Sequence, residues 1–190
     1  MSTITTSLKF RLLREDDLEW ARLLHNEPNV LKMLGDPTVI TKEQQQKWFQ
    51  NLIKSNTSRR IIVENQEEKI GFFRLDRIDY HNRSVETGGD IHKDFRGKGY
   101  AKPIYKKLFN YLFSIGFNRV WLLVAEYNTI GINLYKKLGF QIEGTQHQAF
   151  FKEGEYKNLI MMSILKENWK ADVNLNWQSN DERLLNEIST

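Results

Sequence analysis

The stretch HKDFRGKGYAKPIYKKLFNYLF, residues 92–113, places two glycines directly before an apolar pattern of helical period. Backbone N–H groups at the start of a helix have no partner within the helix and carry partial positive charge, so they bind anions. Gly97 and Gly99 let the backbone adopt unusual angles and approach an anion closely. Three cations add to the charge: Arg96, Lys98 and Lys102. The stretch predicts a phosphate-binding loop, or else a basic surface turn that only begins a helix.

A second pattern, NTIGINLYKKLGF at residues 128–140, follows the apolar run RVWLLVAE. Asn128 stands where the predicted strand ends, and Tyr135 lies two helical turns further along. A tyrosine in this position can be a catalytic group, but a packed aromatic ring with a bonded hydroxyl is the more common case.

Both patterns depend on elements that the rest of the sequence predicts. Alternating or apolar runs separated by turn residues predict seven strands, at residues 8–13, 59–65, 69–80, 84–92, 119–126, 140–151 and 155–165. The run at 119–126 is continuously apolar, as in a strand buried on both faces. Amphipathic spacing predicts four helices, at residues 14–25, 41–55, 99–115 and 128–139. Thr41 and Gln44 form a capping box at the start of the second helix, after a turn at Gly35–Pro37.

The order of these elements predicts an α/β domain with a mixed, mostly antiparallel central sheet flanked by helices. We assign residues 1–166 to this domain and residues 167–190 to a polar C-terminal extension that packs on the domain or on a partner subunit. Only Asp181–Ile188 in this extension has the spacing of a short amphipathic helix.

Composition narrows the function. The 28 Lys and Arg against 24 Asp and Glu give a net charge of +4, too mild and dispersed to require a nucleic acid. There is no cysteine, which excludes disulfides, thiolate zinc sites and a cysteine nucleophile, and no metal site is expected. No apolar run approaches the ~18 residues of a transmembrane helix, and the N-terminus lacks a signal-like core. We expect a cytoplasmic protein that does not bind membranes.

The two motifs together resemble the GNAT superfamily of acyl-CoA-dependent N-acyltransferases. Its phosphate loop, [QR]xxGx[GA], is matched by Arg96, Gly99 and Ala101. Its later signature, NxxAxxLYxKxGF, is matched by all but one residue: Asn128, Leu134, Tyr135, Lys137, Gly139 and Phe140. The departure is Gly131, where the family usually has alanine.

The resemblance implies the GNAT fold, with the central sheet splayed between the two strands that precede the motifs. The bound phosphate would be the pyrophosphate of coenzyme A, with acetyl-CoA or another acyl-CoA as a co-substrate and no permanently bound cofactor. The resemblance places the acyl-CoA contacts on nine residues: Ile91, His92, Arg96, Gly97, Lys98, Gly99, Tyr100, Ala101 and Asn128.

The same resemblance assigns the catalytic groups. Tyr135 is the expected general acid that protonates the departing thiolate. Glu86 is the expected base, acting through water, and Asp90 is a second candidate base or amine-binding carboxylate. By strand alternation Glu86 and Asp90 share one face. A structural carboxylate at Glu86 and a solvated charge at Asp90 are equally open interpretations.

The acceptor amine is expected over the first two helices and the last hairpin. The stretch at residues 24–49 resembles GNAT enzymes that acylate nucleotide-linked amino sugars, and we expect substrate contacts from His25, Asn26, Trp48 and Arg74. A nucleotide-linked amino sugar is the preferred acceptor, followed by a peptide α-amine and then a polyamine such as spermidine. A CoA-binding module without turnover is the alternative to an enzyme, and a homodimer is expected.

Overall fold

The computed structural model describes residues 8–34 and 38–186 of the chain. These residues form two compact units, which are described separately. The first unit takes in residues 1–13, 55–120 and 165–190, and the second takes in residues 14–54 and 121–164.

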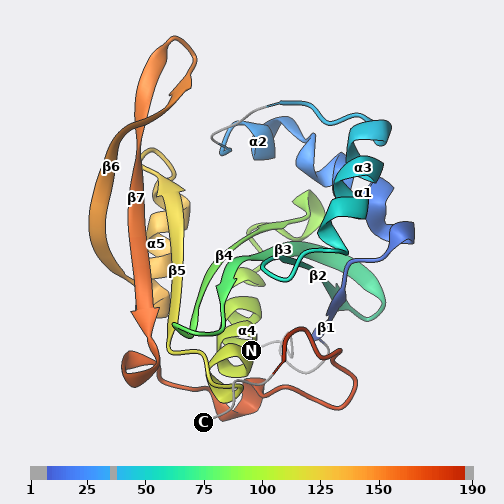
Figure 1. Cartoon of the computed structure of the whole chain (residues 1–190), viewed down its shortest axis with the longest axis vertical. Coiled ribbons are helices and arrows are strands. Elements are labelled where there is room, and N and C mark those ends of the chain that lie inside the picture. The colour runs from blue at the N-terminus through green and yellow to red at the C-terminus, as the bar shows by residue number, and fades with distance from the viewer. Residues whose placement is uncertain (1–7, 35–37, 187–190) are drawn as a thin grey trace. The chain divides into compact units, whose positions relative to one another are not determined.

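The first unit contains an antiparallel sheet of four strands in the order β1-β2-β3-β4 (Figure 1). The strands are β1 (Leu8–Leu12), β2 (Arg59–Asn65), β3 (Glu68–Asp79) and β4 (Ser84–Ile91). Short connections join β2 to β3 and β3 to β4, so each strand pairs with its neighbour in sequence. The meander predicted from the three apolar runs is therefore confirmed.

Helix α4 (Ala101–Ser114) packs against this sheet. The Tyr105 ring meets the edge of Phe73 on β3, with ring centroids 5.1 Å apart. Leu108 and Phe109 are fully buried, as is Ile61 on β2. Full burial of each such side chain is worth about 1.5–3 kcal/mol, so the apolar face of α4 holds in place the helix whose N-terminus follows the glycine loop.

The C-terminal tail covers the outer edge of β1. Phe10 N donates to Asp181 Oδ1 at 2.9 Å, and Glu182 N donates to Phe10 O at 2.8 Å. Asp181 Oδ2 also lies 2.8 Å from Lys107 Nζ, with both side chains almost fully buried. Trp177 stacks on Tyr111 of α4 at 4.1 Å between ring centroids. The tail thus satisfies an edge strand that would otherwise be open to pairing.

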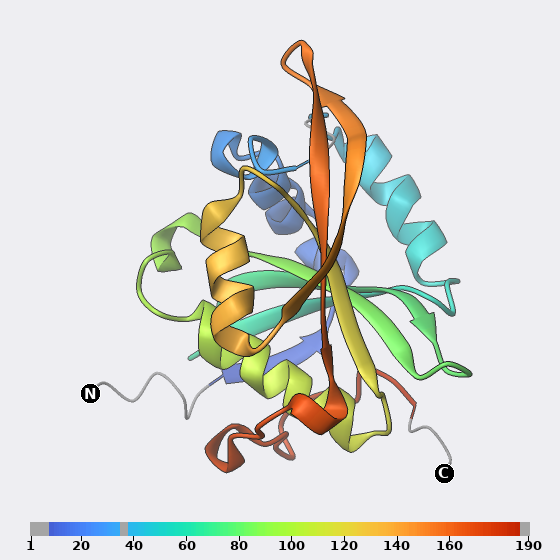
Figure 2. The same ribbon diagram turned by 90° about the vertical axis from the view of Figure 1, so that its left-hand side faces the viewer.

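The second unit combines three N-terminal helices with the later strands (Figure 2). The helices are α1 (Leu18–His25), α2 (Pro28–Leu31) and α3 (Lys42–Leu52), and a 3-10 turn, η1 (Glu15–Asp17), precedes them. Most of β5 (Arg119–Ala125) belongs here, with α5 (Thr129–Leu138), β6 (Gln141–Lys152) and β7 (Glu155–Leu165), and the strand order is β5-β7-β6. Three further 3-10 turns lie in the first unit: η2 (Lys93–Phe95), η3 (Lys166–Asn168) and η4 (Val173–Leu175).

Several local predictions are confirmed in detail. Thr41 caps α3, because Gln44 N donates to Thr41 Oγ1 at 3.2 Å and Thr41 N donates to Gln44 Oε1 at 2.8 Å. Gly139 ends α5 in the left-handed region, with a φ of 98°, where glycine carries no penalty. The mixed α/β class with mostly antiparallel strands is also confirmed, whereas the splaying of the sheet stays a prediction.

Three expectations need correction or lie outside the structure. In β5, buried residues alternate with half-buried ones, so this strand is not uniformly buried on both faces. Residues 181–186 form no helix, because the acidic side chains there bond to β1. Helix α2 was not predicted, and the predicted turn at Gly35–Pro37 lies outside the described residues. Within the described ranges, no helix is long and apolar enough to cross a bilayer.

Candidate active site

The predicted phosphate loop lies between η2 and α4 in the first unit. Gly97 and Gly99 have φ angles of 71° and 86°, in the left-handed region that other residues enter only at a cost. A Cβ built on either glycine would meet no atom within 4 Å. The glycines are therefore required by backbone conformation, and the space beside the loop is open to a ligand.

Contacts to β4 and β2 hold this loop in place. Arg96 Nε donates to Ile91 O at 2.7 Å, which ties the loop to the end of β4. Asn65 Nδ2 donates to the Tyr100 hydroxyl at 3.1 Å. His92 caps η2, with its Nδ1 3.5 Å from Asp94 N. His92, Arg96 and Tyr100 thus have structural contacts in addition to the ligand contacts predicted for them.

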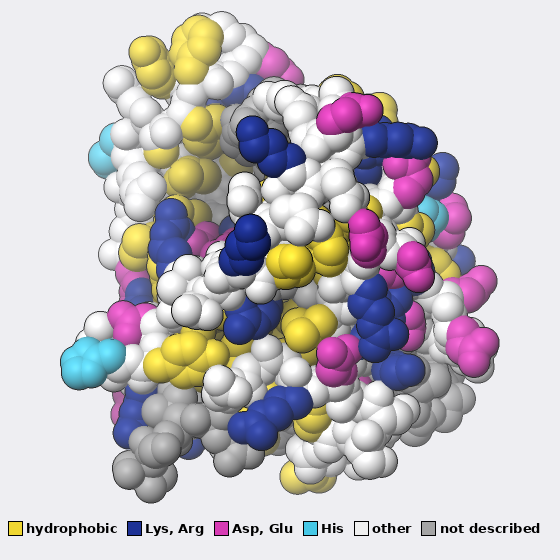
Figure 3. Space-filling view, turned by 45° about the vertical axis from the view of Figure 1, so that its right-hand side comes forward, with side chains coloured by type: hydrophobic (Ala, Val, Ile, Leu, Met, Phe, Trp, Pro, Cys, Tyr) yellow, Lys and Arg dark blue, Asp and Glu magenta, His cyan; other side chains and the backbone are white. Residues whose placement is uncertain are grey.

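The segment that contains the loop has exposed lysines. Lys93 and Lys98 are exposed, and Lys98 Nζ lies 5.7 Å from the centroid of the Phe95 ring. The α4 N-terminus, which begins at Ala101, adds partial positive charge to the same segment. Cations and backbone donors so arranged suit a diphosphate. In Figure 3 the basic and acidic side chains are mixed, without one continuous area of a single charge.

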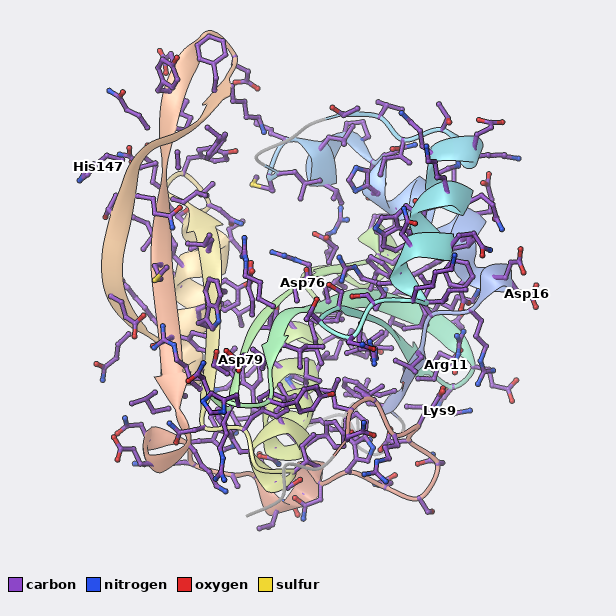
Figure 4. All side chains as sticks on the ribbon, in the orientation of Figure 1. Lys9, Arg11, Asp16, Asp76, Asp79 and His147 are labelled. Carbon is purple, nitrogen blue, oxygen red and sulfur yellow. The ribbon has the colours of Figure 1, made fainter. Side chains whose placement is uncertain are left out.

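Glu86 on β4 is nearly fully buried and faces two guanidinium groups. Its Oε2 accepts a hydrogen bond from Arg77, and its Oε1 lies 3.4 Å from Arg74 Nη1. Arg74 also donates to Asp76 at 3.1 Å, and Asp76 accepts from Arg60 at 2.8 Å. Asp76 is labelled on β3 in Figure 4. The result is a chain of five alternating charges across β2, β3 and β4.

Burial and neighbouring charges act in opposite directions on Arg74 and Asp76. Burial alone would lower the pKa of Arg74, but the carboxylates of Glu86 and Asp76 outweigh it, so the pKa is raised. Burial would likewise raise the pKa of Asp76, but the Arg60 guanidinium together with Ser58 and Arg74 outweighs it, so the pKa is lowered. Arg77 takes part with a φ of 45°, a costly angle for this residue, at a shift in the register of β3 with β4.

The two candidate bases therefore have different surroundings. Glu86 is buried and bonded to two guanidinium groups, which are the surroundings of a structural carboxylate. Asp90 is half-buried, lies opposite Phe72 of β3, and shares the strand face of Gly88. A Cβ on Gly88 would lie 2.6 Å from Arg74 Nε, so the Arg74 side chain covers that face. The structure brings together Glu86, Gly88 and Arg74, and the identity of the base stays a prediction.

Asn128 and Tyr135 belong to the second unit. Asn128 Oδ1 accepts from Gly131 N at 2.9 Å and caps α5. A Cβ on Gly131 would lie 3.0 Å from Asn128 Nδ2, so alanine here would require a small shift of the Asn128 side chain. Tyr135 is half-buried, and its ring centroid lies 5.7 Å from that of Phe140. Asn128 thus has a structural role whether or not it contacts acyl-CoA.

The predicted substrate residues on the N-terminal helices also have structural partners. His25 Nε2 lies 3.2 Å from Thr38 O. Asn26 binds both backbone groups of Ile40, since its Nδ2 donates to Ile40 O at 2.8 Å and its Oδ1 accepts from Ile40 N at 2.9 Å. Trp48 is half-buried on α3. His25 and Asn26 therefore fix the chain before α3, and Arg74 lies in the first unit, within the charge network.

The structural roles of two residues were not predicted from the sequence. Arg77, which pairs with Glu86, sits in an ordinary strand pattern, and only the structure shows its left-handed angle. Lys152 lies in the segment FFKEGE, which reads as a hairpin, yet its side chain is buried. No pattern of residue types signals either role. Among the described residues, no group of His, Asp and Glu could hold a metal ion.

The chain resembles acetyltransferases over most of its length. The family model described as "Acetyltransferase (GNAT) domain" matches residues 7–141. Spermidine N(1)-acetyltransferase of Escherichia coli K12 is 29% identical over 167 residues, covering 87% of this chain and 90% of that protein. A putative ribosomal N-acetyltransferase of Bacillus subtilis is 31% identical over 103 residues, covering 54% of this chain and 56% of that protein.

A solved structure extends the similarity to the fold. The spermidine N-acetyltransferase of Vibrio cholerae, crystallised with CoA and spermine, superimposes with a TM-score of 0.80 at 29% identity. The match covers 86% of this chain and 98% of that one. The tail that covers β1 lies at the C-terminal end of this chain, beyond the residues matched by the family model.

Proposed function

The chain belongs to the GNAT acetyltransferase family, and from this premise we propose that it acetylates a primary amine of a polyamine such as spermidine. It is an acyl-CoA-dependent N-acyltransferase, and acetyl-CoA is its co-substrate. The observation that carries the polyamine proposal is the similarity, over 86% of the chain, to an enzyme crystallised with CoA and spermine. This proposal replaces the preference for a nucleotide-linked amino sugar, because similarity across most of the chain outweighs the short resemblance at residues 24–49.

The glycine loop binds the pyrophosphate of acetyl-CoA in this proposal. Gly97 and Gly99 supply left-handed backbone with open space beside it, and the N-terminus of α4 supplies donors and partial positive charge. Lys98 adds a full charge on the same segment. These groups bind the pyrophosphate and take no part in the acyl transfer itself. Their role is to hold acetyl-CoA in place.

The acyl transfer itself needs three things from the protein. The amine must lose a proton, since an alkylammonium has a pKa of about 10.4. The thioester carbonyl must be polarised, for which the backbone N–H of Ile91 is our candidate donor. The departing thiolate must gain a proton, and Tyr135 supplies it in this proposal. Asp90, which is more exposed than Glu86, is the better placed of the two carboxylates to take the amine proton.

One feature of the first unit favours a second acceptor class. The Arg74 side chain is 38% exposed and covers Gly88, on the strand face that also bears Asp90. A guanidinium on that face attracts a phosphate or carboxylate and repels a polycation. A nucleotide-linked amino sugar therefore stays the second candidate.

Steady-state kinetics with three acceptors test the proposal: spermidine, a nucleotide-linked amino sugar and an alanine-initiated peptide. Released CoA is measured by thiol titration, and the acetylated product is identified by mass spectrometry. We expect the highest kcat/KM with spermidine. A higher value with the sugar would overturn the polyamine proposal in favour of the second candidate, and Arg74→Ala would then lower kcat/KM for the sugar more than for spermidine.

The expected homodimer is tested by light scattering on the same preparation.

A further inference from the structure

Lys152, the last residue of β6, has its ammonium group inside a cage of backbone oxygens in the second unit. The residue is only 7% exposed. Its Nζ donates to three carbonyl oxygens, those of Leu31 at 3.1 Å, Lys32 at 2.6 Å and Leu34 at 2.8 Å. It also lies 3.2 Å from the Tyr127 hydroxyl and 5.5 Å from the centroid of that ring.

The three carbonyls belong to the C-terminal end of α2 and the residues after it. Carbonyl groups at the end of a helix have no partner within the helix, and they carry partial negative charge. A cation at that position is stabilising. The helix α2 has only four residues, Pro28–Leu31, too few to be stable by itself. Its position therefore depends on contacts from outside it, and Lys152 supplies several of them.

A pocket of about 400 Å³ adjoins this contact. Its lining comes from two sources, α2 with the next residue on one side and the tip of the β6–β7 hairpin on the other: Pro28, Leu31, Lys32, Phe151, Lys152 and Glu153. Phe151 is 60% exposed and offers an apolar ring. The two walls are far apart in sequence, and the Lys152 ammonium bonds directly from one to the other.

We propose that Lys152 is a positioning residue for the acceptor amine, because it clamps α2 to the β6–β7 hairpin and so holds the walls of this pocket at their working separation. The pocket receives the part of the acceptor away from the reacting amine. The lining combines apolar surface from Pro28, Leu31 and Phe151 with the Glu153 carboxylate and the Lys32 side chain. The apolar surface and the carboxylate suit an aliphatic chain that carries a second ammonium group. This inference rests on the proposed function.

If Lys152 positions the acceptor, its replacement should raise the KM for spermidine selectively. Loss of a purely structural lysine would not have this selective effect. Lys152→Met keeps most of the side-chain volume, removes the charge and removes the Nζ hydrogen bonds to the three carbonyls. We expect the KM for spermidine to rise about tenfold or more, while kcat and the KM for acetyl-CoA change by less than about twofold. Lys157→Met on β7 is the matched control, since Lys157 pairs with the exposed Glu155. The control is expected to leave all three constants near their wild-type values.

Hydrogen exchange of the backbone at residues 28–34 gives a second readout that does not depend on turnover. We expect faster exchange there in Lys152→Met than in the wild type or in Lys157→Met. A second variant, Lys152→Ala, controls for poor packing of the Met side chain. n-Propylammonium has the three carbons and the ammonium group that this variant lacks, so it can occupy their place. Added n-propylammonium should restore protection and lower the KM for spermidine in this variant, with N-acetylspermidine quantified by mass spectrometry.

The outcomes separate the two proposals. If the wild type does not acetylate spermidine but Lys152→Met accelerates exchange at residues 28–34, the polyamine proposal and the acceptor role of Lys152 both fail and only the clamp stands. If spermidine is acetylated and Lys152→Met changes neither exchange nor KM, the clamp is wrong. Equal changes in the KM for spermidine and for acetyl-CoA would reduce Lys152 to a general structural residue and overturn its role in positioning the acceptor.

Discussion

Gly99→Ala tests whether the left-handed backbone of the glycine loop is needed to bind acetyl-CoA. Gly99 has a φ of 86°, and a Cβ there would meet no protein atom within 4 Å. The substitution therefore creates no clash within the protein. Its cost comes from the backbone angle, which an alanine disfavours by about 1–2 kcal/mol.

The expected loss of affinity depends on whether the backbone cost is present in the free protein or only in the complex. In the free variant the loop can relax to an angle that alanine prefers, and binding must then restore the left-handed angle. With about 1.4 kcal/mol for each factor of ten, 1–2 kcal/mol corresponds to a Kd for acetyl-CoA that is roughly 5 to 30 times higher. A ligand in van der Waals contact with the glycine would add a steric penalty to this range.

Isothermal titration calorimetry with acetyl-CoA measures the effect, and Gly154→Ala is the matched control. Gly154 lies in the turn between β6 and β7, has a φ of 83°, and also has open space at its Cβ position. It carries the same backbone cost away from the loop, so its Kd should equal that of the wild type. A Gly99→Ala affinity within twofold of the wild type, or an equal loss in Gly154→Ala, would refute the loop assignment.

Three further changes test other parts of the account. Tyr135→Phe should lower kcat while the Kd for acetyl-CoA is kept, and unchanged turnover in a stopped thiol assay would remove Tyr135 as the acid. Asp181→Ala should lower the free energy of unfolding in urea by about 3–5 kcal/mol, because it leaves Lys107 buried without its charge partner; a loss below about 1 kcal/mol would show that the tail contributes little. Burial raises the pKa of Asp76, but Arg60, Ser58 and Arg74 together outweigh it and lower that pKa, so the contribution of Asp76 to stability is full above its unfolded pKa of about 3.9 and is lost as the pH falls through the folded pKa. Asp76→Asn should therefore destabilise the protein at neutral pH and flatten the acid side of its stability curve, and parallel acid unfolding curves would contradict the role of this ion pair.

The order of strands and main helices could be predicted because each is coded locally. The alternation in the runs that became β2, β3 and β4 depends on which residues face the core, and the capping box of Thr41 and Gln44 needs only four consecutive residues. The two motif loops were found for the same reason, since Gly97, Gly99 and Gly139 mark backbone angles that few other residues adopt.

What escaped prediction depends on contacts between distant residues. Helix α2 is too short for a helical period to appear, and Lys152, more than a hundred residues later, bonds to its end. The segment after Asp181 has helical spacing, but its carboxylates bind β1 instead. Glu86 looked like a base from its place in the motif, and only the fold shows that Arg74 and Arg77 enclose it. Local pattern reveals none of these pairings.

The most direct test of the central claim is to incubate the protein with acetyl-CoA carrying an isotopically labelled acetyl group, in the presence of spermidine. We expect labelled N-acetylspermidine and free CoA thiol to appear in equal amounts, and both to be lost together in Tyr135→Phe. If acetyl-CoA binds but no labelled acetyl group reaches spermidine, the claim that this chain transfers acetyl groups to a polyamine is contradicted.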